Sequence, residues 1–216
     1  MAQKAHNLIV SVATAAEAAD TITGITNADP GVVTSTGHGI PDGGIVLIQG
    51  VGGMVEINDR VFVARSVAAN SFALGGVDTS IAQGYSAYTT GGTAIRQTMT
   101  AIGEVRSTGG ADGSAQEIPT THLRSRAQEF LMGLQDAGSW QIELWEPGSG
   151  GDPGFTRLKK LKDSQAAGVF SVQLSSGLIA CFRAYVTSLP VQSLTPDSAV
   201  GRSATLRITN TFGEFA

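Results

Sequence analysis

Apolar and polar residues alternate at every second position in several runs of the second half, and this pattern most constrains the fold. In residues 140–145, Trp140, Ile142 and Leu144 share one side, whereas Gln141, Glu143 and Trp145 share the other. A period of two residues is that of a β-strand with one face on a core. The pattern therefore predicts a mainly β protein.

Further runs of the same kind supply the partners that such a strand needs. Phe170, Val172 and Leu174 alternate before the turn 175–177, and alternation resumes from Leu178 to Val186. This arrangement predicts a β-hairpin. Ala204, Leu206 and Ile208 predict a last strand, and Leu8, Val10 and Val12 predict a first strand rather than part of a secretory leader.

One α-helix is predicted, at about residues 152–163. Asp152 can cap the first free N–H groups, Pro153 suits the first helical position, and Phe155, Leu158 and Leu161 recur on one side. The remaining face carries Arg157, Lys159, Lys160 and Lys162. A solvated face near the helix C-terminus explains these cations better than a contact with DNA, which stays the alternative.

Composition changes sharply between Thr21 and Ile95. These 75 positions hold 14 of the 28 glycines but only seven charged residues. Short β-type runs at 45–48, 61–67 and 72–74 alternate with turn signals such as Pro41–Asp42–Gly43–Gly44. The segment is therefore predicted to form a separate small barrel or sandwich.

Charge and motifs argue against a catalytic or nucleic-acid-reading protein. A net charge of -4 and a pI of about 5.3 give no basic surplus for phosphate binding. His6, His38 and His122 stand singly at expected surface or turn positions, without zinc spacing, and Gly50–Val51–Gly52–Gly53 lacks the ending of a phosphate loop. We expect no enzyme activity, no cofactor, no metal and, because no run approaches about 18 apolar residues, no membrane partner. Cys181 is predicted to be a buried small hydrophobe.

The segment from Ser107 to about Gln128 is polar and offers few apolar anchors. Ile118 and Leu123 are its only sizeable apolar residues, so it cannot build a core alone. Connections of this length are uncommon in compact domains and tend to be functional or disordered. We expect a functional loop here.

Around that segment the chain resembles the tail tube proteins of long-tailed, siphovirus-type bacteriophages. The motifs are Glu104–Val105–Arg106–Ser107, Gly113–Ser114–Ala115–Gln116–Glu117–Ile118, then Ser125, Glu129–Phe130, Gly133–Leu134, Asp136 and Gly138. The resemblance covers roughly residues 96–216 and the first strand. It implies an antiparallel β-barrel or sandwich with one helix, assembling as homohexameric rings. Stacked rings would form a conduit for the tape measure protein and later for double-stranded DNA, which passes without sequence recognition.

In that family the loop packs on neighbouring subunits. The resemblance therefore implies an interface made by the residues that match the motif, namely Glu117, Ile118, Thr121, Leu123, Ser125, Glu129 and Phe130. Two positions depart from the family pattern, because Pro119 and Arg124 stand where acidic residues are expected. Any salt bridge made by those acids in relatives does not carry over.

Residues 21–95 have a resemblance of their own. Gly37–His38–Gly39, Gly50–Val51–Gly52–Gly53–Met54, Asn70–Ser71–Phe72 and Tyr88–Thr89–Thr90–Gly91–Gly92 are similar to a small β-barrel module of ubiquitin-activating enzymes and phage structural proteins. The resemblance implies no active site. We expect 21–95 to be an insert in a discontinuous tail tube domain of residues 1–20 and 96–216.

The expected function is that of a structural protein of the virion tail, made in the host cytoplasm. Two alternatives stay open. One is a tail terminator, or a related ring or tube protein of a contractile particle. The other is a monomeric carbohydrate-binding module in which exposed Tyr85 and Tyr88 stack on a sugar, although core packing is the commoner fate of such tyrosines.

Overall fold

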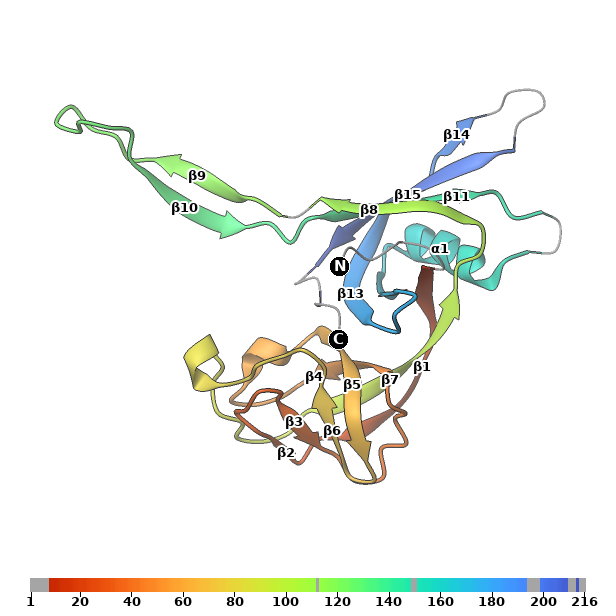
Figure 1. The fold of residues 1–216 in the computed structure, drawn as a ribbon, viewed down its shortest axis with the longest axis horizontal. Helices are drawn as coiled ribbons and strands as arrows, with labels where there is room; N and C mark the ends of the chain where they lie inside the picture. The colour runs from red at the N-terminus through yellow and green to blue at the C-terminus, as the bar shows by residue number, and fades with distance from the viewer. Residues whose placement is uncertain (1–7, 112, 149–150, 194–198, 210–212, 214–216) are drawn as a thin grey trace.

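A computed structural model describes residues 8–111, 113–148, 151–193, 199–209 and 213. In this part of the chain the structure is mainly β, as the alternation predicted, with the single helix α1 (Figure 1). The strands are β1 (Ile9–Thr21), β2 (Gly24–Ile25), β3 (Val32–Thr34), β4 (Ile45–Gln49), β5 (Arg60–Ala68), β6 (Ser71–Leu74), β7 (Thr93–Ala101), β8 (Val105–Ala111), β9 (Ala115–Pro119), β10 (Phe130–Gln135), β11 (Ser139–Trp145), β12 (Ala167–Gln173), β13 (Ile179–Ser188), β14 (Val191–Ser193) and β15 (Gly201–Ile208). The helix α1 spans Pro153–Ser164, and two 3-10 turns, η1 (Val55–Ile57) and η2 (Ile81–Gln83), complete the set.

Thirteen strands form one curled, entirely antiparallel sheet. Its order is β2-β3-β6-β5-β4-β7-β1-β12-β13-β15-β11-β8, with β14 paired to β15. The predicted hairpin is confirmed as β12 and β13, which pair from Ala167↔Tyr185 to Gln173↔Ile179. The remaining strands, β9 and β10, form a separate two-stranded sheet.

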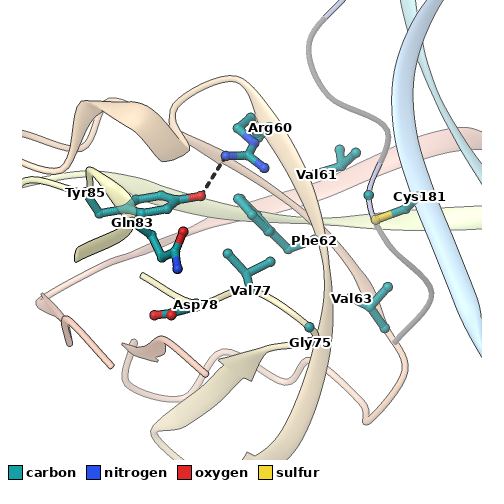
Figure 2. A pocket seen from close by; sticks show the side chains of 12 residues that line it. Arg60, Val61, Phe62, Val63, Gly75, Val77, Asp78, Gln83, Tyr85 and Cys181 are labelled. Carbon is teal, nitrogen blue, oxygen red and sulfur yellow. Dashed lines mark hydrogen bonds between the residues drawn. The ribbon is translucent and has the colours of Figure 1, made fainter. Parts of the chain in front are cut away.

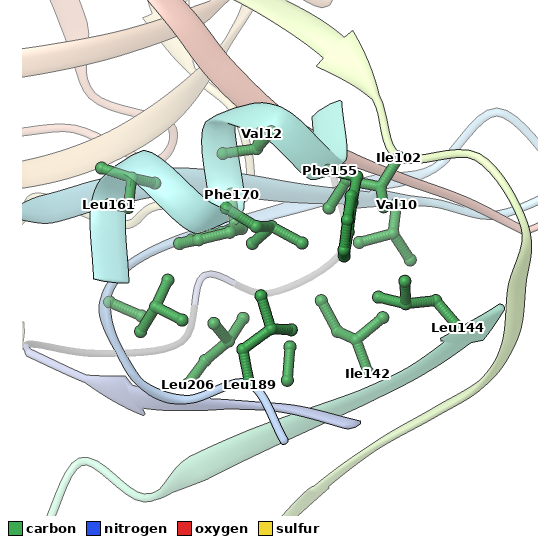
Figure 3. Packing of buried hydrophobic residues seen from close by; sticks show 14 of the residues in the cluster. Val10, Val12, Ile102, Ile142, Leu144, Phe155, Leu161, Phe170, Leu189 and Leu206 are labelled. Atoms are coloured by element: carbon green, nitrogen blue, oxygen red, sulfur yellow. The ribbon is translucent and has the colours of Figure 1, made fainter. Parts of the chain in front are cut away.

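The body of the molecule is built on one apolar cluster between the sheet and α1 (Figure 3). Ile142 and Leu144 of β11, Phe170 of β12 and Leu206 of β15 are at most 1% exposed. They meet Phe155 of α1 across this core, as Figure 3 shows. The alternation therefore identified the inward face of these strands correctly.

Helix α1 begins and packs as its sequence predicts. The Asp152 carboxylate accepts the Gly154 N–H at 2.9 Å, and Pro153 is the first helical residue. Phe155, Leu158 and Leu161 are its buried apolar residues. Gly154 permits close packing on β7, because an added Cβ would lie 2.5 Å from the Ala101 carbonyl oxygen.

Residues 21–95 enclose a second apolar cluster, which includes Ile48, Met54, Phe62, Phe72 and Leu74. The predicted short strands are present as β4, β5 and β6. His38, expected at a surface or turn position, is instead 6% exposed. Its Nδ1 accepts the Ile40 N–H and its ring contacts Phe72 edge-on, so it serves this core.

Strands β1 and β7 run continuously from one core to the other (Figure 1). They pair from Ser11↔Ala101 to Thr21↔Thr93, with two register shifts. The first strand is thus longer than the alternation of Leu8, Val10 and Val12 indicated. The alanines at 15, 16, 18 and 19 show no alternation with polar residues, so the continuation of the strand could not be predicted.

A third, smaller apolar cluster joins the two cores. Ile45 and Val63 of the 21–95 segment pack with Val169 of β12 and Cys181 of β13. Consequently β12 is buried on both faces, whereas its alternation indicated one buried face. Cys181 is buried as predicted, and burial raises the pKa of its thiol to about 12.

Candidate subunit interface

The predicted functional loop is a β-hairpin that projects from the body (Figure 1). Strands β9 and β10 pair at Phe130↔Pro119, Leu131↔Ile118 and Met132↔Glu117. The segment 107–128, which was expected to be a functional loop, therefore contains regular β-structure. Residues up to Ala111 continue the main sheet as β8, and the hairpin starts at Ala115.

The connecting turn of this hairpin is held by its own polar side chains. The Thr121 hydroxyl accepts the Glu129 N–H at 3.0 Å, and the Thr120 N–H donates to the Glu129 carbonyl at 2.8 Å. The Ser125 hydroxyl accepts the His122 N–H at 3.1 Å. Thr121, Ser125 and the backbone of Glu129 thus shape the turn, and Leu123 at its end is fully exposed.

The apolar side chains of the hairpin lie outside all three clusters. Ile118 is 48% exposed, Phe130 55%, Leu131 62%, Met132 65% and Leu134 96%. Because neighbouring residues of a strand point to opposite faces, Leu131 and Met132 make both faces of the hairpin apolar. Exposed apolar surface of this kind marks an interaction site.

Three of these residues, Leu131, Met132 and Leu134, were absent from the predicted interface set. The available signal was the unbroken apolar run from Phe130 to Met132, since a strand covered on both faces carries such a run. The structure brings all seven predicted residues into one hairpin. Glu117 and Ile118 lie on β9, Phe130 begins β10, and the others form the turn.

The root of the hairpin is fixed by a glycine and an ion pair. A Cβ on Gly113 would overlap the carbonyl oxygen of Asp136. The Asp136 carboxylate accepts the Gly138 N–H at 3.1 Å and pairs with Arg207 of β15 at 2.5 Å. These contacts tie the direction of the hairpin to the main sheet.

Replacing Gly113→Ala is expected to redirect the hairpin without unfolding the body. The added methyl has no space, whereas the body core does not involve this residue. We expect the association constant between subunits to fall at least about tenfold, which corresponds to about 1.4 kcal/mol per contact. The melting temperature of the subunit should change little. Assembly is measured by sedimentation; Gly24→Ala, where the nearest atom is at 3.7 Å, is the control. Equal effects of the two variants would contradict the role of Gly113.

Strand β8 is the last strand of the main sheet, beyond β11. The Ser107 hydroxyl donates to the Glu143 carboxylate at 2.8 Å, and the Arg106 guanidinium lies 4.6 Å from the centre of the Trp145 ring. The hydrogen bond from Ser107 is the main cause that lowers the pKa of Glu143. In the described part of the chain the outer edge of β8 has no strand partner, so it is open to a further strand.

A carboxylate at the end of β11 joins the strand, the helix and β15. Glu146 accepts a hydrogen bond from Arg202, and its other oxygen lies 3.6 Å from the Lys159 ammonium. The hydrogen bond from Arg202 is the main cause that lowers the Glu146 pKa. Burial acts in the opposite direction, and the positive charges of Arg202 and Lys159 lower the pKa further.

The Glu146 contacts predict a pH dependence of stability. Because the folded pKa lies below the ordinary 4.5, the contribution is complete above 4.5 and is lost as pH falls through the folded pKa. Glu146→Gln should lower the free energy of unfolding by about 1 kcal/mol near neutral pH and by less in acid. Urea unfolding across that range measures it. Glu104→Gln, whose carboxylate has no ion pair in the described residues, is the control; a pH-independent deficit in Glu146→Gln would refute the assignment.

The basic residues of α1 make mostly structural contacts. The Arg157 guanidinium donates to the Ala13 carbonyl at 2.9 Å, and Lys159 also lies 4.4 Å from the centre of the Phe155 ring. Lys160 and Lys162 are exposed. Within the described ranges there is no group of three or more metal-ligating side chains, and no helix is long and apolar enough to span a membrane. His6 lies outside the described residues.

The fold is that of a β-rich protein with a projecting hairpin whose apolar side chains are exposed. A family model described as "Phage tail tube protein, TTP" matches residues 52–216, most of the chain. The chain therefore belongs to the phage tail tube protein family, whose members assemble into the tube of the virion tail. No curated protein matches the chain.

Proposed function

We propose that this protein is the major tail tube subunit of a siphovirus-type phage. In this proposal its copies form homohexameric rings, and the rings stack into a conduit for the tape measure protein and for ejected DNA. Synthesis in the host cytoplasm precedes assembly. A net charge of -4 favours a conduit, because an acidic protein repels the DNA backbone and limits sticking.

The two-faced hairpin carries the proposal. A hairpin with one apolar face can lie on a single surface, whereas Leu131 and Met132 require cover on both sides. In a stack, the hairpin of one copy can enter between surfaces of neighbouring copies. Burial of a large apolar side chain contributes about 1.5–3 kcal/mol, and each copy supplies several.

Strand β8 offers a second contact of the same kind. Sheet edges are hazards in a monomer, but they become interface material in a closed ring. Gly109 leaves open space on one face of this edge strand, so a neighbouring backbone can approach. Ring closure through β8 and stacking through β9–β10 would use different surfaces.

Residues 21–95 are proposed to be an inserted module that decorates the tube. The separate second apolar cluster supports an independent folding unit. The third cluster supports a fixed orientation, together with an ion pair of 3.1 Å between Arg183 of β13 and Asp59. An outward position tolerates the glycine-rich turns, whereas a position in the lumen would obstruct DNA.

Negative-stain electron microscopy of the concentrated protein tests the function. Long tubes with a central channel are expected, whereas single rings would favour a tail terminator. A purely monomeric protein that binds glycans would favour the carbohydrate-binding module. The exposed-tyrosine form of that alternative has less support, because Tyr85 and Tyr88 are half-buried and their hydroxyls bond to Arg60 and to the Ile22 carbonyl.

A further inference from the structure

A cavity between the 21–95 module and β13 is lined by no residue of strand β8 or of the β9–β10 hairpin. Its volume is about 450 Å³, within the range of small-ligand sites. Strand β5 forms one wall with Arg60 and Phe62, and Asp78, Gln83 and Tyr85 line the other side (Figure 2). Cys181 of β13 and Gly213 complete the lining.

Arg60, Tyr85 and Asp78 of this cavity are held in place by hydrogen bonds. The Arg60 guanidinium donates to the Tyr85 hydroxyl at 2.9 Å and lies 5.4 Å from the centre of the Phe62 ring. The Asp78 carboxylate accepts the Ser80 N–H at 2.8 Å through one oxygen. Figure 2 shows the side chains of Asp78 and Gln83 on the same side of the cavity. Arg60, Tyr85 and Asp78 are therefore preorganised, whereas the Gln83 side chain is exposed.

Donors and acceptors remain available on this fixed frame. In the described part of the chain, the second carboxylate oxygen of Asp78 and the side-chain amide of Gln83 have no protein partner. Arg60 uses one of its terminal nitrogens for both of its hydrogen bonds. An Asp carboxylate accepts, an Arg guanidinium donates and a Gln amide does both. Val77 supplies accessible apolar surface, whereas Phe62 and Val63 are only 3% and 2% exposed.

The balance of these groups selects the ligand class. Arg60 and Asp78 carry opposite charges, so neither an anion nor a cation is favoured as a whole. A purely apolar ligand would leave the Asp78 and Gln83 groups without partners. A sugar ring presents neutral hydroxyls that both donate and accept, and it has an apolar C–H face for Val77. We propose that this cavity binds one saccharide unit of a glycan.

The site is a property of the single subunit and does not depend on tube formation. Saturation-transfer-difference NMR on the unassembled full chain, with glucose, galactose, N-acetylglucosamine and rhamnose at about 10 mM, suits a millimolar site. At least one sugar should give a signal. Asp78→Asn and Gln83→Ala should each weaken binding at least about threefold and together at least about tenfold.

The control is Asp42→Asn, which makes the same chemical change at a carboxylate of the same module that pairs with Arg65 instead. It should bind the sugar like the parent chain. Absence of any sugar signal, or equal binding by all variants, would overturn the proposal. Tubes formed by the Asp78→Asn variant in electron microscopy would show that sugar binding and assembly are separate, so failure of one leaves the other standing.

Discussion

The paired substitution Leu131→Asp with Met132→Asp is expected to abolish tube assembly while the subunit stays folded. The two side chains are 62% and 65% exposed, lie on opposite faces of β10 and belong to none of the apolar clusters. If both are buried against neighbours, their loss weakens each contact by at least about 3 kcal/mol, or roughly a hundredfold. A buried carboxylate adds a further desolvation cost.

Two measurements distinguish lost assembly from lost folding. Sedimentation velocity should show tubes for the parent chain and unassembled subunits for the double variant, and thermal unfolding should stay within about 2 °C. Ile81→Asp is the matched control, because Ile81 is 71% exposed on the 21–95 module, away from the hairpin. Each single variant should weaken assembly, since each removes cover from one face. If the double variant formed normal tubes, the hairpin would not be part of the subunit interface.

Excising residues 22–92, with a two-residue Asn-Gly turn in their place, is expected to leave a folded body that still forms tubes. Thr21 and Thr93 are paired opposite each other, so the turn would close a β1–β7 hairpin. The apolar cluster between the sheet and α1 keeps all its residues. The third cluster is opened, however, and exposes Val169 and Cys181. This exposure should cost several kcal/mol and lower the melting temperature by roughly 10 °C.

A second excised chain separates exposure of that cluster from a direct role of the module in assembly. It carries Val169→Thr and Cys181→Ser, which make the newly exposed face polar. This chain should be more soluble than the simple excision and should form tubes without the lateral projection. A soluble, cooperatively unfolding excised chain that forms no tubes would show that 21–95 is part of the assembly machinery rather than a decoration.

Much of the body could be predicted because its strands are covered on one face. Ile142 and Leu144 alternate with polar residues, and Asp152 followed by Pro153 marks the start of α1. Turn signals likewise located β4, β5 and β6 of the 21–95 segment. In each of these cases local chemistry and the final environment agree.

Sequence patterns did not predict packing between segments that are distant along the chain. Val169 occupies a position that alternation assigns to solvent, and only the folded chain brings Ile45 and Val63 into its cluster. Cys181 shares that cluster, but its burial was predicted from its side-chain chemistry. His38 was expected at a surface or turn position; it follows a turn but is buried, because its partner Phe72 comes from the distant strand β6. Local patterns carry no information on such packing.

The hairpin was not predicted, for a related reason. Ile118, Leu123 and Phe130 lie on an exposed segment, but the polar stretch before Phe130 gave no sign that β9 pairs with β10. The apolar run of the projecting strand β10 packs on no core within the subunit. In our proposal its packing partner is another copy of the chain.

Electron cryomicroscopy of the assembled tube tests the central claim most directly. The density for residues 115–135 should lie between copies of the chain, with the side chains of Leu131 and Met132 covered on opposite faces. A hairpin that projects freely into solvent from the tube, with both faces bare, would contradict the account.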